Sequence, residues 1–255
     1  MTKLGIITCQ ILELEFAHIL SNDPDISEIW IVADAFSKEL IEILEDRGLQ
    51  QVHRASNMGE LDADETIDIA VLVRVMEVGL HSNISTLRQE VVAAVKDIAP
   101  FVNAVLLGYG LCGNALNNTS ELFDDIRIPV MLPMQNEKPV DDCVSLIIGG
   151  TENYYEEQCR CAGTMFMNAG FSRHWDKILS MNIPTKLIHK KDKILDRIWG
   201  HYKRSLLLTT PVLGEKELRD NTKDFNDRFG LKTETRAGTL SILENAWKEL
   251  KKAAI

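Results

Sequence analysis

An apolar run that ends in a cluster of glycines constrains this chain more than any other stretch. Residues 104–107 are uninterrupted and apolar, and they lead directly into the sequence Gly108-Tyr109-Gly110-Leu111-Cys112-Gly113-Asn114. A short apolar segment that stops at glycines is typical of a buried strand in a parallel sheet, followed by a loop whose backbone approaches a ligand. We therefore expect the functional site to lie near Cys112.

Strand-like and helix-like segments alternate along the rest of the chain. This alternation predicts an α/β fold with a Rossmann-like parallel sheet and helices on both faces. Residues 1–135 would form this lobe, and residues 136–255 a second, smaller α/β lobe packed against it. We expect strands at 4–8, 28–33, 67–73, 102–107, 128–132, 164–168, 205–210 and 231–236. We expect helices at 11–20, 35–46, 84–98, 171–179, 186–202, 215–229 and 238–250. The polar segment 53–65 is predicted to be a loop, and residues 140–148 fit a strand or a helix, with a helix favoured.

Charge and hydropathy exclude two classes of function. The 255 residues carry a formal net charge of −10, which argues against a general binder of nucleic-acid phosphates. No segment approaches the roughly 18 consecutive apolar residues of a membrane helix, and the start of the chain has no signal-peptide pattern. We expect a cytoplasmic protein without a membrane partner. Nothing in the sequence indicates an oligomeric state.

Four residues with metal-binding side chains fall at predicted strand ends or helix starts. Cys9, His81 and Cys112 follow strands, and Cys143 lies in the first turn of the helix expected at 140–148, where the helix dipole would favour a thiolate. Because ligands of parallel sheets bind at the carboxyl ends of the strands, we expect these residues to share one edge. Thiolate and imidazole ligands suit zinc, with an iron–sulfur cluster as the alternative.

The same residues allow readings without a metal. Cys112 could be a nucleophile or redox thiol, with His81 as its base and Cys143 as its partner. The chain could also be a non-catalytic carrier of a small molecule or a corrinoid. In each scheme Gly108, Gly110 and Gly113 would let the backbone approach the ligand, and Tyr109 and Asn114 could hydrogen-bond it.

Other candidates carry less weight. The spacing Gly108-x-Gly110-x-x-Gly113 matches a dinucleotide fingerprint, but no long periodic helix follows it and no acidic residue ends the next strand. Cys159 and Cys161 are expected to point to opposite faces of a strand, so joint ligation of one metal ion would be strained. We interpret both cysteines as incidental. Glu13 and Glu15 are expected to be solvated.

The chain also resembles a family from methanogenic archaea and anaerobic bacteria that is known only as a domain of unknown function. The residues that carry this resemblance are Cys9, Leu80-His81-Ser82-Asn83, Leu87-Arg88, the stretch 108–114, Asp142-Cys143, Leu146, Gly149, Tyr155, Gly163-Thr164 and Gly170. The resemblance implies an association with one-carbon and corrinoid metabolism, and it implies no specific reaction.

Together these observations favour a thiolate-rich zinc site formed by Cys9, Cys112 and Cys143, with His81 as a ligand or a supporting group. Such a site suits activation of a thiol for alkyl or methyl transfer, because zinc keeps a bound sulfur deprotonated. The expected partners are a small-molecule thiol or methyl donor and, as a further possibility, a corrinoid protein. The catalytic residues would be Cys112 and His81.

Overall fold

A computed structural model of the protein describes residues 2–49, 51–56, 68–181, 183 and 185–255. The chain divides into two compact units. The first consists of Met1–Cys143 together with Ser241–Ile255, and the second of Val144–Leu240. Each unit has its own parallel sheet, and each is described separately below.

The first unit is built on a six-stranded parallel sheet, as the alternating sequence pattern predicts. The strand order is β3-β2-β4-β1-β5-β6. The strands are β1 (Thr2–Cys9), β2 (Ile26–Val32), β3 (Val52–Ala55), β4 (Ile69–Met76), β5 (Ala104–Gly108) and β6 (Val130–Met131). All five residues of β5 are buried, which explains why its sequence is continuously apolar rather than alternating. The Rossmann-like fold expected from the sequence is confirmed.

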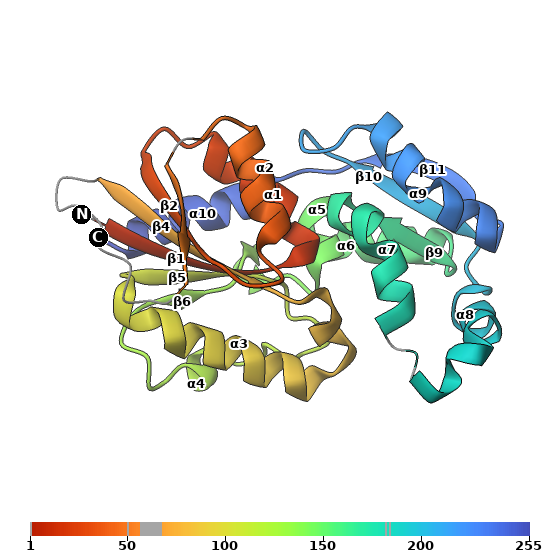
Figure 1. The fold of residues 1–255 in the computed structure, drawn as a ribbon, viewed down its shortest axis with the longest axis horizontal. Coiled ribbons are helices and arrows are strands. Elements are labelled where there is room, and N and C mark those ends of the chain that lie inside the picture. The colour runs from red at the N-terminus through yellow and green to blue at the C-terminus, as the bar shows by residue number, and fades with distance from the viewer. Residues whose placement is uncertain (1, 50, 57–67, 182, 184) are drawn as a thin grey trace. The chain divides into compact units, whose positions relative to one another are not determined.

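Helices cover both faces of this sheet. α1 (Glu13–Ser21) and α2 (Lys38–Asp46) lie on one face, and α3 (Ile84–Ile98) and α4 (Thr119–Leu122) lie on the other (Figure 1). The short 3-10 segments η1 (Gln10–Leu12), η3 (Val78–Ser82) and η4 (Ala99–Phe101), and the antiparallel pair β7 (Met134–Gln135) and β8 (Lys138–Pro139), complete the unit up to residue 143. None of the described helices has the length and apolar character that crossing a bilayer requires.

The last helix returns to the first unit. α10 (Ser241–Ala253) packs against β5, and its Trp247 indole donates a hydrogen bond to the Asp23 carboxylate. Lys251 Nζ lies 2.6 Å from Asp23 Oδ2 and 2.9 Å from Asp25 Oδ2. The two units therefore differ from the expected lobes 1–135 and 136–255, because the apolar face of α10 is buried on the sheet of the first unit.

The second unit is a smaller α/β unit with a three-stranded parallel sheet in the order β11-β10-β9. Its strands are β9 (Thr164–Met167), β10 (Arg204–Thr209) and β11 (Lys232–Ala237). Its helices are α5 (Cys143–Ile148, which starts at the unit boundary), α6 (Thr151–Arg160), α7 (Ala169–Met181), η5 (Thr185–Lys190), α8 (Lys191–Trp199) and α9 (Glu215–Phe229).

Most elements lie where the sequence predicts them, with three differences. Residues 52–55 form an edge strand beside β2 instead of the start of a loop, and the expected loop residues 57–65 lie outside the described part of the chain. The helix expected at 186–202 is divided into η5 and α8. The helix favoured for 140–148 begins only at Cys143, after the short strand at 138–139 and three residues that belong to neither element.

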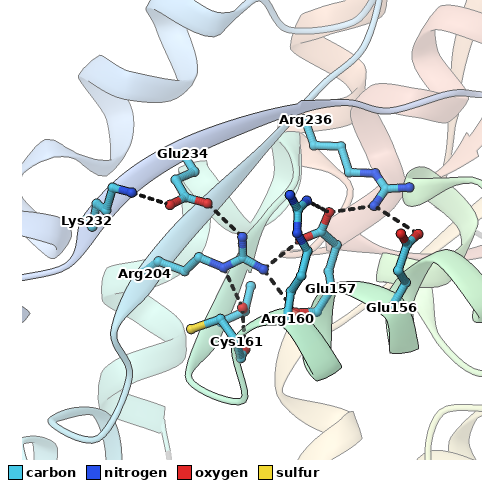
Figure 2. A network of polar contacts seen from close by, with 9 residues as sticks. Glu156, Glu157, Arg160, Cys161, Arg204, Lys232, Glu234 and Arg236 are labelled. Carbon is cyan, nitrogen blue, oxygen red and sulfur yellow. Dashed lines mark hydrogen bonds and ion pairs between the residues drawn. The ribbon is translucent and has the colours of Figure 1, made fainter.

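A buried ion-pair network joins the strands of the second unit to α6 (Figure 2). Arg204, the first residue of β10, lies 2.6 Å from Glu157 and 2.7 Å from Glu234. Glu157 also accepts a hydrogen bond of 2.6 Å from Arg236, and only 3% of its side chain is exposed. Burial opposes ionisation of Glu157, but the hydrogen bonds from the two arginines outweigh it and lower the pKa of Glu157.

We predict that Glu157→Gln destabilises the second unit by about 3 kcal/mol at pH 7, because it leaves the Arg204 charge partly uncompensated. A carboxylate with a lowered pKa stabilises the fold above its unfolded-state pKa, and this contribution is lost as the pH falls through the folded-state value. The difference in unfolding free energy between Glu157→Gln and the native protein should therefore be constant between about pH 7 and 5 and should shrink below about pH 4.

Hydrogen exchange of β10 peptides as a function of urea measures this difference. Glu156→Gln is the matched control, because the Glu156 side chain is 66% exposed and lies 3.9 Å from Arg236. Equal effects of the two substitutions at pH 7 would contradict the prediction.

Candidate functional site

The candidate site begins where two central strands end. β1 and β5 are hydrogen-bonded neighbours, with Thr8 opposite Gly108, so Cys9 and Tyr109 follow at the same edge of the sheet. The helix after β1 lies on one face, while the helix after β4, the other neighbour of β1, lies on the opposite face (Figure 1). In open α/β sheets, ligands bind outside the carboxyl ends of the strands at a reversal of this kind.

Two glycines allow the loop after β5 to pass close to its neighbours. A Cβ atom on Gly108 would lie 2.3 Å from the Phe16 ring. On Gly110 it would lie 2.5 Å from the backbone nitrogen of Asp142 and 2.8 Å from the Val140 carbonyl oxygen. Backbone atoms cannot swing aside as a flexible side chain can, so only glycine fits at position 110.

This close approach brings two cysteines together. The Leu111 amide donates a 2.9 Å hydrogen bond to the Val140 carbonyl, and the Cys112 amide donates a 2.8 Å hydrogen bond to the Asp141 carbonyl. The loop thus runs alongside residues 140–142, and Cys143 follows immediately. The helix α5 begins at Cys143, two residues after Asp141.

Cys112 opens a left-handed turn. The φ angles of Cys112, Gly113 and Asn114 are 46°, 66° and 68°. Asparagine and glycine adopt this conformation readily, whereas for cysteine it costs roughly 1–2 kcal/mol. A strained residue of this kind is often found at a functional site, where the surrounding structure holds it in place.

The electrostatics of Tyr109, Cys112 and Cys143 show that the three residues and Cys9 form one cluster. Burial raises the pKa of Cys112 to about 12, with further contributions from Cys9 and Asp142. Burial also raises the pKa of Tyr109 well above its usual value, and the next causes are Cys9, Cys112 and Cys143. Apart from burial, the groups that raise the pKa values of Tyr109 and Cys112 are therefore all acidic side chains.

Cys143 differs from its expected state. The sequence predicted a helix start whose dipole would favour the thiolate, but burial instead raises the pKa of Cys143 well above the usual thiol value. Asp142, Cys112, Cys9 and Glu15 raise it further, in that order. A helix of six residues provides too little dipole to offset this desolvation.

The Tyr109 hydroxyl points to a missing ligand. Tyr109 is 4% exposed, and its hydroxyl is buried without a hydrogen-bond partner among the described residues. A buried hydroxyl left in this state costs about 1–3 kcal/mol, so native proteins usually give it a partner, water or an ion. After burial, the charges that raise the pKa of this hydroxyl come from Cys9, Cys112 and Cys143.

Two acidic residues that we expected to be solvated are buried. Glu13 and Glu15 have no exposed surface, and Glu15 lies close enough to Cys143 to raise its pKa. The sequence contains a signal for this burial, because both glutamates lie within the largely apolar stretch 11–20. The expectation of solvation is wrong, and Glu15 adds an acid to the cluster.

His81 lies in a different environment from the cysteines. Its side chain belongs to the exposed part of η3, and its Nδ1 is hydrogen-bonded to the carbonyl oxygen of Val78 in the same segment. It is not among the groups that shift the pKa values of Tyr109, Cys112 or Cys143. The Nδ1 atom of His81 is therefore engaged in a hydrogen bond within its own 3-10 segment.

The remaining candidates lie as follows. Gly113 and Asn114 are exposed in the left-handed turn. Cys159 is exposed and Cys161 is half-buried at the end of α6 in the second unit, and the five cysteines, all within the described part of the chain, form no disulfide. Among the described residues of the first unit, no three side chains of the metal-binding types have their ligand atoms all within 4.8 Å of one another.

We predict that Gly110→Ala destabilises the first unit by about 3 kcal/mol, because the added methyl group meets backbone atoms on a segment that cannot move independently. Gly214→Ala is the control: a Cβ there meets nothing within 4 Å, and the cost should stay near 0.5 kcal/mol. Urea unfolding followed by circular dichroism compares the two variants. Equal losses of stability would show that the close approach is not a constraint.

Comparison with known proteins identifies a family but no function. No curated protein and no solved structure matches the chain. One family model, described as a protein of unknown function (DUF1638), matches residues 75–247, which include His81, Cys112 and Cys143 and exclude Cys9. This match spans well over half of the chain, and the chain therefore belongs to the DUF1638 family of proteins of unknown function.

Proposed function

We propose that the first unit binds zinc through Cys9, Cys112 and Cys143 and uses the site to hold an exogenous thiol for alkyl transfer. The observation that carries this proposal is that Cys9, Cys112 and Cys143 all raise the pKa of Tyr109, whose buried hydroxyl has no hydrogen-bond partner among the described residues. Cysteine thiolates are preferred zinc ligands, and catalytic zinc sites use three protein ligands with one open position.

Binding an ion would require the three sulfur atoms to move closer together. Zinc–thiolate bonds are about 2.3 Å long, so bound sulfur atoms lie closer together than 4.8 Å. The sulfur atoms of Cys9, Cys112 and Cys143 are not all this close in the structure. Rotation about the single Cα–Cβ bond of each cysteine moves its sulfur without moving the backbone, and binding would supply the free energy for this change.

The surrounding charges favour a cation. Glu15 and Asp142 contribute negative charge next to the thiols, and Glu15 is fully buried. A divalent ion would stabilise the thiolate forms that are unfavourable in its absence.

Alkyl transfer fits a site with three thiolate ligands. When bound, zinc would keep an exogenous thiol deprotonated near neutral pH. The sulfur of that thiol would attack the alkyl carbon of the donor, forming an S–C bond, while the bonding electron pair leaves with the donor group. Tyr109 would donate its hydroxyl hydrogen bond to the group in the open position and so orient it.

The one-carbon and corrinoid association implied by the family resemblance makes a methyl group our preferred alkyl group. A methyl-corrinoid protein is a suitable donor class, because its methyl group is transferred to thiolate nucleophiles as a cation equivalent. His81 is retained in this proposal only as a supporting residue, since its Nδ1 is engaged with Val78.

A metal-free thiol enzyme is less well supported. A nucleophilic cysteine needs a lowered pKa, whereas the pKa of Cys112 is raised to about 12. At neutral pH only a very small fraction of that thiol would be ionised. Activation by a bound cation resolves this difficulty, so the raised value favours a metal-dependent role for Cys112.

We predict that anaerobically purified protein contains about one zinc per chain, measured by elemental analysis. Cys9→Ser, Cys112→Ser and Cys143→Ser should each lose most of this zinc, because each removes a ligand. Cys159→Ser is the matched control and should retain it, since Cys159 is exposed in the second unit. Circular dichroism verifies that each variant is folded.

The absence of stoichiometric metal from the folded native protein would contradict the proposal. Stoichiometric iron with an absorbance band in the visible would replace zinc by an iron–sulfur cluster at the same cysteines.

A further inference from the structure

Arg88 lies outside the thiol cluster but is bonded to the turn that carries Cys112. It belongs to α3, and its Nε donates a 2.8 Å hydrogen bond to the carbonyl oxygen of Ala115. Its Nη2 donates a second hydrogen bond, of 3.1 Å, to the carbonyl oxygen of Asn114. One guanidinium thus binds two successive carbonyl groups.

The Cys112 amide anchors the start of the turn through its 2.8 Å hydrogen bond to the Asp141 carbonyl, but the backbone hydrogen bonds within the turn are long. The hydrogen bond from the Leu116 amide to the Leu111 carbonyl is 3.2 Å long, and the one from Ala115 to Cys112 is 3.4 Å long. Both are longer than a typical backbone hydrogen bond. Cys112, with φ of 46°, would relax to a negative φ if this turn opened.

We propose that Arg88 is a positioning residue that holds Cys112 in the left-handed conformation needed to direct its thiol toward Cys9 and Cys143. The proposal rests on the proposed metal site for its functional meaning, but the positioning itself is a property of the metal-free chain. The planar guanidinium presents two donors in a fixed geometry, and a lysine ammonium does not.

If Arg88 keeps the turn closed, it also lowers the reactivity of Cys112 toward alkylating agents. Cys112 is half-buried, and opening of the turn would expose its thiol further, so a faster alkylation rate reports a larger population of the open form. A hydrogen bond to a charged group contributes enough that losing the pair should raise this population about tenfold, after allowance for the solvent exposure of Arg88.

The test is the alkylation rate of each cysteine in metal-free protein, measured by mass spectrometry with iodoacetamide. Arg88→Met should raise the rate at Cys112 about tenfold and leave the rate at Cys9 unchanged, and Arg88→Lys should rescue it only in part. Arg54→Met is the matched control, since Arg54 forms an exposed 2.8 Å ion pair with Glu45 elsewhere in the same unit.

General loss of stability would instead raise the rates at Cys9 and Cys112 together, and that result would overturn the proposal. An unchanged Cys112 rate in Arg88→Met would overturn it as well.

Zinc affinity separates this inference from the proposed function. If native protein binds zinc, Arg88→Met should bind it about tenfold more weakly in a competition with a chromophoric chelator, because Cys112 must first be reordered. If native protein binds no zinc, the proposed function fails, while the alkylation rates still decide whether Arg88 positions Cys112.

Discussion

The close approach of Gly110 to the backbone of Asp142 determines where the candidate site lies. Two backbone hydrogen bonds, from Leu111 to Val140 and from Cys112 to Asp141, follow from this approach. They bring a cysteine that follows β5 next to a cysteine 31 positions later in the chain. Because β5 pairs with β1, the same loop also meets the end of β1, where Cys9 lies.

The resulting cluster is unusual because its members disfavour one another's ionised forms. Three thiols, a phenol and two carboxylates lie near one edge of the sheet, where Cys9, Tyr109 and Glu15 are buried and the other three residues are half-buried. Desolvation is the largest cause of the raised pKa of Tyr109, Cys112 and Cys143. A protein gains no stability from concentrating acids in this way. We propose that a cation binds at this cluster, and the buried Tyr109 hydroxyl, which has no hydrogen-bond partner among the described residues, supports that proposal.

The second unit illustrates the opposite use of buried charge. Arg204 and Thr164 are the first residues of their strands, and Glu157 lies between two arginines there. Every charge named in this network has an opposite charge next to it, and the carboxylate pKa is lowered instead of raised. We interpret this network as part of the fold's stability, since it needs no ligand to balance it.

The sequence predicted the regular parts of the fold because these depend on local patterns. Residues 84–98 form a helix capped by Asn83, whose side chain accepts a hydrogen bond from the Thr86 amide, and residues 215–229 also form the expected helix. The strand at β3 was missed because only its pairing with β2 defines it. Likewise, tertiary packing places α10 on the first sheet.

The candidate site was predictable only in part, for the same reason. The strand ends at Cys9 and before Cys112 follow from local sequence, and the topology of a parallel sheet brings strand ends together. The proximity of Cys143 depends on a backbone contact at Gly110 that no local pattern reveals. The burial of Glu15 and the separate environment of His81 depend on packing, which a helical or turn pattern alone does not specify.

X-ray absorption spectroscopy at the zinc edge tests the central claim most directly. For the native protein purified without added metal, the account predicts three sulfur neighbours at about 2.3 Å and one further ligand in the zinc coordination sphere. In Cys112→Ser the sulfur count of any remaining zinc should fall to two. A zinc environment of only nitrogen and oxygen atoms, or native protein without zinc, would contradict the account.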